Sequence, residues 1–185
     1  MPRHPNLLDR NKTALVIVDV QTRLSSIMEK RRAVLDNLAK LIKGCRILSV
    51  PVFFTEQYPK GLGRTEQPLL DLLVDVTPVE KIRFSVCQEE ALMKPLTQKG
   101  LVQIVLVGME THVCILQSAL DFLHHGFHVH LPADAVCSRR ESDHHHGLKR
   151  MAGQGVTITS TEAVLFELAE TAGTAEFKQI SQLVK

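Results

Sequence analysis

Cys114 is the residue of this sequence whose setting best suits covalent chemistry. It comes just after the segment Gly108–Thr111, within the first turn of a helix predicted over residues 111–125. Free backbone N–H groups and the dipole at a helix start stabilise a thiolate, lower its pKa and can hold an oxyanion. A buried and inert thiol is the alternative, and it is the commoner fate of a free cysteine. Cys45, on the apolar face of a predicted helix, and Cys87, which has no helix start beside it, fit that alternative.

Two charged residues at predicted strand ends, Asp19 and Lys81, are candidates to activate such a thiol. Asp19 closes an apolar run and could accept the thiol proton, although an acid in this position is also a common cap of the following turn. Lys81 could keep Asp19 ionised and stabilise developing negative charge, although a lone lysine is usually a surface residue. The residue types alone do not favour this trio over other combinations, but parallel strands end at one edge of a sheet and would bring all three together.

The nine histidines do not form a recognisable metal-binding pattern. His128 and His130 are two residues apart on a predicted strand and share one face, whereas the histidines at 144–146 are consecutive and cannot all face one ion. No acid stands at a matching strand end, and the four cysteines include no Cys-x-x-Cys pair. We therefore expect neither a metal site nor a cofactor.

Strands and helices alternate along the chain, and these elements must position the candidate residues. Within residues 13–19 the five residues 14–18 are apolar, and three of them are Val or Ile, as is typical of a strand buried on both faces of a parallel sheet. Further strands are predicted at residues 52–55, 78–81, 101–107, 127–131 and 156–159. Helices are predicted at residues 31–50, 88–99, 111–125, 141–154, 161–169 and 174–184. Pro95 is expected to kink or shorten its helix, and Thr161 is expected to cap another.

This alternation predicts one three-layer α/β domain over residues 1–185, with a parallel, Rossmann-like sheet covered by helices on both faces. Ligands of such sheets bind outside the carboxyl ends of the strands. The predicted loop 56–65, which carries a proline and two glycines, follows one of those ends.

The composition argues against several other classes of function. Lysine and arginine number 22 and aspartate and glutamate 20, and the only dense basic run is Lys30–Arg32, so no nucleic-acid partner is expected. No apolar stretch is long enough to span a membrane. The polar N-terminus has no signal core, and four thiols without a close pair suit a reducing compartment. We expect a cytoplasmic protein that acts on a small molecule.

Four segments resemble one known family: TALVIVDVQ from residue 13, EKIRFS from residue 80, GMETHVCILQSALDFL from residue 108 and PADAVCSR from residue 132. Together they resemble the isochorismatase-like cysteine hydrolase superfamily. The segments TEQYPKGLGRT and FELAETAGTAEFKQISQLVK are similar to its isochorismatase-domain-containing branch. The likeness runs from Thr13 to about Val184 and implies a six-stranded parallel sheet.

The resemblance implies a catalytic triad of Asp19, Lys81 and Cys114. It also implies a non-proline cis peptide bond, here between Met109 and Glu110, just before Thr111. The N–H groups near Thr111 and Cys114 would then face a substrate oxygen as an oxyanion hole.

Two departures from the family narrow the expected chemistry. Glu56-Gln57-Tyr58 stands where the nicotinamidase branch has an Asp-x-His metal motif, so a zinc-dependent nicotinamidase is not expected. Isochorismatases of the siderophore type lack the cysteine nucleophile and cleave a vinyl ether. Because this chain keeps Cys114, we predict hydrolysis of an amide or ureide C–N bond through a thioester intermediate.

The resemblance leaves the substrate open. Candidates to line its pocket are Leu24, Gln57, Tyr58, Phe84 and His112. Two other functions are possible on the same fold: a vinyl-ether hydrolase acting through Asp19, and a non-catalytic or redox-responsive thiol protein. Family members usually associate, so we expect a homo-oligomer, with the apolar stretch 69–76 as a candidate contact.

Overall fold

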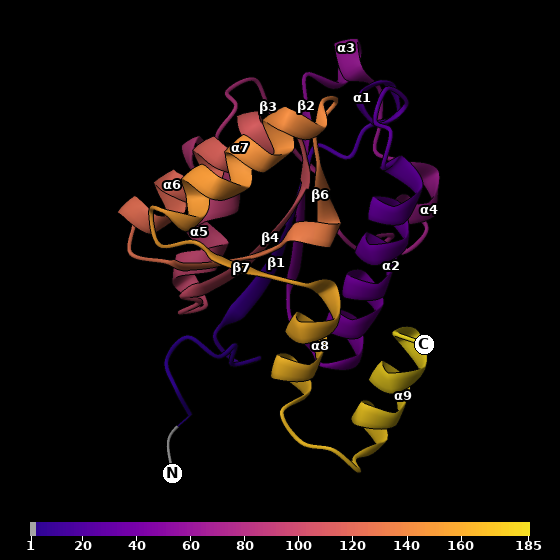
Figure 1. Cartoon of the computed structure of the whole chain (residues 1–185), viewed down its shortest axis with the longest axis vertical. Coiled ribbons are helices and arrows are strands. Elements are labelled where there is room, and N and C mark those ends of the chain that lie inside the picture. The colour runs from indigo at the N-terminus through magenta and orange to yellow at the C-terminus, as the bar shows by residue number, and fades with distance from the viewer. Residues whose placement is uncertain (1–2) are drawn as a thin grey trace.

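A parallel β-sheet lies between two layers of helices in the computed structural model, which describes residues 3–185 (Figure 1). The strands are β1 (Thr13–Val18), β2 (Val52–Gln57), β3 (Val79–Lys81), β4 (Gln103–Met109), β5 (His128–Pro132), β6 (Val136–Cys137) and β7 (Thr157–Thr159). The helices are α1 (Thr22–Ser25), α2 (Arg31–Ile47), α3 (Pro59–Leu62), α4 (Gln67–Leu70), α5 (Glu90–Gln98), α6 (Leu116–His124), α7 (Glu141–Ala152), α8 (Thr161–Ala169) and α9 (Ala175–Leu183). Shorter segments are the 3₁₀ turns η1 (Val86–Gln88) and η3 (Ala133–Ala135) and the π-helical segment η2 (Thr111–Ile115).

The sheet has the order β3-β2-β1-β4-β5-β7, and each of these neighbouring pairs is parallel. The two-residue strand β6 pairs with the end of β4 beside this path, so that Met109 lies opposite Cys137. The predicted α/β fold with a parallel sheet is therefore confirmed, with seven strands in place of six. Strand β6 is too short to show a periodicity in the sequence, which is why the pattern does not reveal it.

Helices α2, α8 and α9 cover one face of the sheet, and α5, α6 and α7 cover the other (Figure 1). Strand β1 is buried along its whole length and serves both layers. Leu15 and Ile17 join the apolar cluster beneath α2, whereas Ala14, Val16 and Val18 join the cluster on the opposite face. The unbroken apolar run of β1 follows from this arrangement, since each of its side chains faces a layer of helices.

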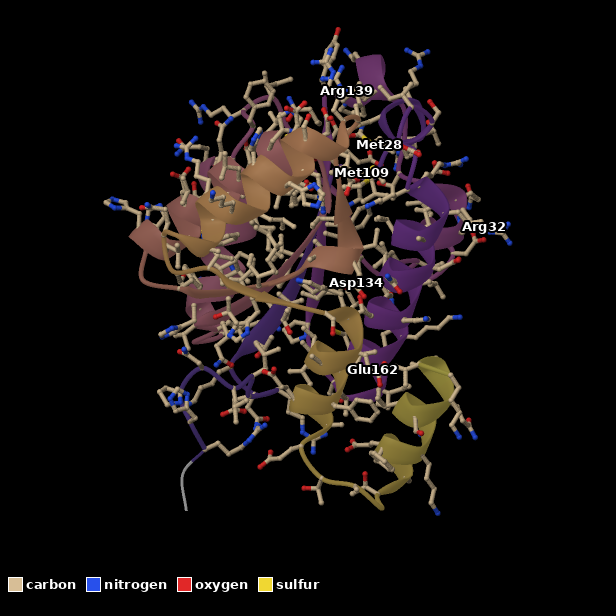
Figure 2. All side chains as sticks on the ribbon, in the orientation of Figure 1. Met28, Arg32, Met109, Asp134, Arg139 and Glu162 are labelled. Carbon is tan, nitrogen blue, oxygen red and sulfur yellow. The ribbon has the colours of Figure 1, made fainter. Side chains whose placement is uncertain are left out.

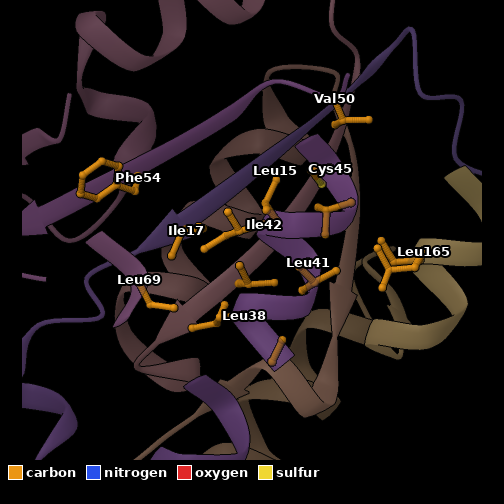
Figure 3. Close-up of a cluster of buried hydrophobic side chains, with 14 of the residues drawn as sticks. Leu15, Ile17, Leu38, Leu41, Ile42, Cys45, Val50, Phe54, Leu69 and Leu165 are labelled. Carbon is orange, nitrogen blue, oxygen red and sulfur yellow. The ribbon is translucent and has the colours of Figure 1, made fainter. Parts of the chain in front are cut away.

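The core on the α2 side is built mainly from aliphatic side chains. Leu38, Leu41, Ile42 and Cys45 come from successive turns of α2 and are fully buried, and Leu165 of α8 belongs to the same cluster (Figure 3). Burying one such leucine or isoleucine contributes about 1.5–3 kcal/mol. Within residues 3–185, no helix combines the length and the apolarity needed to cross a bilayer.

Some predicted helix ends are displaced by local backbone features. Helix α2 ends at Ile47, three residues earlier than predicted, and Ser49 just beyond it has a left-handed φ of 58°. The cap of α8 is Ser160 and not Thr161, because the Ala163 N–H donates to Ser160 Oγ at 3.3 Å. Both helix ends are set by the backbone conformation or hydrogen bonding of a single residue, and the apolar periodicity of the sequence does not reveal such local features.

Two other elements differ from the prediction in length. Helix α5 begins at Glu90 and not at residue 88, and Pro95 lies inside it without ending it. Strand β2 continues to Gln57, because its last residues pair with β3 and place Gln57 opposite Lys81. Helix α3 occupies part of the predicted loop 56–65.

Strands β1 and β4 approach each other closely at Gly108. This glycine has a φ of 119°, and a Cβ atom in its place would lie 2.1 Å from the carbonyl oxygen of Val18. Only glycine tolerates both the backbone conformation and the contact. The close approach brings the end of β4 against the end of β1, where Asp19 follows.

We expect Gly108→Ala to destabilise the protein by more than about 3 kcal/mol, because the methyl group meets backbone that cannot move aside. Gly100→Ala is a matched control: Gly100 also has a positive φ, 65°, but a Cβ there meets nothing within 4 Å. The control should lose only about 1–2 kcal/mol, the penalty of the left-handed conformation. The free energy of unfolding in urea measures both, and equal losses would show that the contact with β1 is not tight.

Candidate active site

The structure brings Asp19, Lys81 and Cys114 together at the carboxyl ends of three strands. Asp19 follows β1, Lys81 is the last residue of β3, and Cys114 lies in η2 just after β4. Lys81 Nζ is 2.6 Å from Asp19 Oδ2 and 3.7 Å from Cys114 Sγ. The side chains of Asp19 and Lys81 have no exposed surface, and Cys114 is 6% exposed. The three groups thus form one buried cluster.

Asp19 is held by its own backbone and by β2. Its φ of 53° is left-handed, which is uncommon for a residue other than glycine and turns the chain at the end of β1. Its N–H donates to Thr55 O at 3.2 Å, and its Oδ1 accepts from Thr55 Oγ1 at 2.7 Å. With Lys81 on Oδ2, both carboxylate oxygens have partners and their orientation is defined.

Lys81 donates to a ring of acceptors that suits a charged ammonium. Besides Asp19, its Nζ contacts Gln57 Oε1 at 2.6 Å, Phe84 O at 3.1 Å and Arg83 O at 3.3 Å. A buried ammonium is tolerated only when an opposite charge and further acceptors surround it. The surroundings of Lys81 therefore compensate for the burial of its ammonium beside the Asp19 carboxylate.

The pKa of the Cys114 thiol is raised to about 12, chiefly by burial and further by the Asp19 carboxylate, with Lys81 acting in the opposite direction. The predicted lowering of this pKa by the helix start is wrong, because the loss of solvation outweighs the effect of the helix. At neutral pH the thiol is protonated in the resting protein. A base would be needed to convert it to a thiolate, and the Asp19 carboxylate lies beside it.

The π-helical turn η2 changes the hydrogen bonding around Cys114. In an α-helix the Cys114 N–H would donate to the carbonyl of Glu110. Here that carbonyl accepts from Val113 N at 3.1 Å and from Ile115 N at 3.2 Å, and not from the Cys114 N–H. π-turns of this kind are frequent at functional sites. The turn thus separates the Cys114 N–H from the carbonyl that it would meet in an α-helix.

The residues before η2 form the rest of this turn. The peptide bond between Met109 and Glu110 is cis, at the position that the family resemblance implies. Met109 is buried in the α2-side cluster, and Glu110 Oε1 accepts from the backbone N–H and the Nε of Arg139 at 3.2 and 3.1 Å. Figure 2 shows Met109 and Arg139 at the same end of the sheet. The sequence reasoning missed Arg139, although it follows the two-residue strand β6 within the PADAVCSR segment.

The predicted pocket residues are placed in three ways. Gln57 and Phe84 reach the triad through Lys81, the first with its side chain and the second with its carbonyl. Tyr58 is 52% exposed and lines a cavity of about 680 Å³ with Lys81. Leu24 packs against the apolar cluster on the α2 side.

His112 is the fifth predicted pocket residue, and it faces a separate cavity of about 490 Å³. The cavity is also lined by Arg139, Arg140 and Asp143. His112 Nδ1 lies 2.9 Å from Ser138 Oγ. Within residues 3–185, no three histidine, cysteine, aspartate or glutamate side chains are grouped to hold a metal ion.

Comparisons with known proteins agree on one family. A family model described as the isochorismatase domain matches residues 13–163. Isochorismatase family protein 1B of Dictyostelium discoideum is 39% identical over 178 residues, which cover 94% of this chain and 86% of that protein.

Solved structures show the same likeness. One described as MAR1 ribonuclease from Caenorhabditis elegans has a TM-score of 0.89 at 34% identity and covers 96% of this chain and 91% of that chain. The YcaC gene product of Escherichia coli, described as an octameric hydrolase of unknown specificity, has a TM-score of 0.88 and covers 99% and 92% of the two chains. Its identity is 22%, so it supports the fold alone.

The raised pKa predicts that Cys114 carries no thiolate in the resting protein. Because thiolates absorb in the ultraviolet, subtracting the titration of Cys114→Ser from that of the wild type isolates this one thiol. We expect a flat difference from about pH 6 to about pH 9, a range that spans the ordinary thiol pKa of about 8.5. A step in absorbance below about pH 8, as reactive low-pKa cysteines give, would contradict the dominance of burial.

Proposed function

This chain belongs to the isochorismatase domain family, and we propose that it cleaves a C–N bond of a small amide or ureide through a thioester on Cys114. The observation that carries the proposal is the buried cluster in which Lys81 Nζ lies 2.6 Å from Asp19 Oδ2 and 3.7 Å from Cys114 Sγ. It provides a nucleophile, a base and a cation within contact of one another, which is what covalent catalysis by a thiol requires.

In the proposed first half-reaction, Asp19 takes the proton of Cys114 and the thiolate attacks the substrate carbonyl. The N–H groups of Thr111 and Cys114 hold the resulting oxyanion. The C–N bond then breaks, and Asp19 returns the proton to the leaving nitrogen. In the second half, Asp19 takes a proton from water, the hydroxide attacks the thioester, and the departing Cys114 sulfur recovers the proton as the acid is released.

Lys81 has two roles in this scheme. Before proton transfer it stabilises the Asp19 carboxylate, and afterwards it faces the Cys114 thiolate. The proton moves within the cluster, so the net charge of the buried site stays the same at each step. This matters because bringing a new unpaired charge into a buried site costs several kcal/mol.

The two alternatives are less well supported. A redox-responsive thiol is normally an exposed thiolate of low pKa, whereas Cys114 is largely buried and its pKa is raised. A vinyl-ether hydrolase acting through Asp19 needs no nucleophile at position 114, and it would leave the contact between Lys81 and the sulfur unexplained.

A small molecule is the proposed substrate because little of Cys114 is exposed. The relative from Caenorhabditis elegans is described as a ribonuclease. RNA is not proposed here, since the chain has 22 basic residues against 20 acidic ones and no extended basic run.

We propose that the protein forms homo-oligomers in the cytoplasm. Tyr58, Ile82 and Phe84 are apolar and at least half exposed around the edge strand β3, and an octameric relative has this fold. The stretch 69–76 is a weaker candidate for the contact, because its leucines at 69 and 73 are buried in this chain. All four cysteines are free, as a reducing compartment would keep them.

A screen of small amides and ureides tests the proposal, with the wild type, Cys114→Ala and the matched control Cys87→Ala. Cys87 is also a buried thiol, but its Sγ contacts Ser118 O and not Asp19 or Lys81. On any substrate of the wild type, Cys114→Ala should lose about 10⁴-fold or more in kcat, the scale seen when a nucleophile is removed, and Cys87→Ala should lose little. Mass spectrometry of quenched reactions should find the acyl group on Cys114.

Three outcomes would overturn the proposal. Wild-type turnover by Cys114→Ala would exclude the thiol as nucleophile. Turnover of a vinyl ether without an adduct would favour catalysis by Asp19. Cleavage of an RNA added to the screen, abolished in Cys114→Ala while no amide is turned over, would replace the proposed substrate class.

A further inference from the structure

We propose that His144 of α7 is a positioning residue for the oxyanion hole, acting through the side chain of Thr111. The inference rests on the proposed function, because it assigns to Thr111 an N–H that faces the substrate oxygen. His144 Nδ1 lies 2.9 Å from Thr111 Oγ1, and this bond joins two residues that are 33 positions apart. It is a link between the turn that carries Cys114 and a helix on the outer layer.

The burial of both partners makes this hydrogen bond specific. Thr111 is completely buried and His144 is 7% exposed. A polar group in such a position needs its partner, since leaving it unsatisfied costs about 1–3 kcal/mol. His144 and Thr111 therefore determine each other's orientation, and the backbone of Thr111 is held with its side chain.

One turn further along α7, Gly147 packs closely against the backbone of the same turn. A Cβ atom at Gly147 would lie 3.2 Å from both Thr111 Cγ2 and Thr111 O, and 3.3 Å from His112 Cα. Positions 144 and 147 share a face of the helix, and both are buried. Helix α7 thus contacts the first residues of η2 at two points, through a hydrogen bond at His144 and through close packing at Gly147.

These two contacts lie at the start of η2, where the helical hydrogen bonding is irregular. The Glu110 carbonyl accepts from Val113 and Ile115 and not from Cys114, so η2 lacks the bond that residue 114 would make in an α-helix. Oxyanion-hole donors are effective only when they are fixed before the reaction begins. His144 supplies that rigidity from outside the turn.

The charge of His144 also suits this place. Burial lowers the pKa of its ring, Glu141 opposes that shift, and Lys30 and His145 add to it. The ring is therefore neutral at neutral pH. It can hold Thr111 without adding a charge to the balance between Asp19 and Lys81.

The test compares His144→Leu, which keeps an apolar volume but loses the hydrogen bond, with His144→Asn, whose amide can replace Nδ1. His145→Asn is the matched control, because His145 is an exposed neighbour on the same helix. On a substrate of the wild type, His144→Leu should lose about 10- to 100-fold in kcat with KM nearly unchanged, as expected for support given only to the transition state. His144→Asn should recover most of that loss, and His145→Asn should match the wild type.

Hydrogen exchange gives a second readout that needs no substrate. We expect the backbone amides of residues 111–114 to exchange at least about 10-fold faster in His144→Leu than in His144→Asn, at equal free energy of unfolding. Unchanged exchange and unchanged kcat in His144→Leu would overturn the positioning role. So would equal losses in the Leu and Asn variants, which would indicate a general packing defect.

The two proposals fail in distinguishable ways. If Cys114→Ala is inactive on a substrate that His144→Leu turns over normally, only the positioning role is wrong. If no substrate shows turnover that depends on Cys114, the proposed function fails, and the exchange experiment still decides whether His144 holds the turn.

Discussion

The buried ion pair between Asp19 and Lys81 is the interaction on which the rest of the site depends. Neither side chain has exposed surface, and taking two charges out of water costs several kcal/mol per ion unless good geometry and further hydrogen bonds compensate. Strand β2 supplies part of that compensation, because it lies between β1 and β3 and directs Thr55 to Asp19 and Gln57 to Lys81. The pair therefore requires these three strands in this order and register.

In the proposed mechanism, the same pair allows a thiol that is protonated at rest to react. Cys114 is delivered to it by β4, which approaches β1 closely enough at Gly108 that no side chain fits between them. Burial raises the pKa of this thiol and so favours its protonated form in the resting protein. In the proposed mechanism the proton moves to Asp19 when substrate arrives, and Lys81 then faces the new thiolate. In this mechanism the thiol becomes a nucleophile only with the help of the neighbouring base.

What the sequence predicts well here is local in the chain. The apolar run 14–18 and the alternation of strands and helices suffice to predict the parallel sheet and its helix layers, and the meeting of strand ends then follows. What it misses depends on residues far apart. Nothing near Thr55, Arg139 or His144 in sequence reveals its partner, and β6 has only two residues. The direction of the Cys114 pKa shift was mispredicted for the same reason, since the helix start is a local feature and burial is not.

A double-mutant cycle on the ion pair tests the central claim most directly, with the free energy of unfolding in urea as the readout. Asp19→Asn and Lys81→Met each leave a buried charge without its partner, so each should lose about 3–5 kcal/mol. The double variant has no unpaired charge and should lose clearly less than the sum, by more than about 1 kcal/mol. Losses that add to within about 0.5 kcal/mol would show that the two charges are not coupled, and would contradict a site organised around this pair.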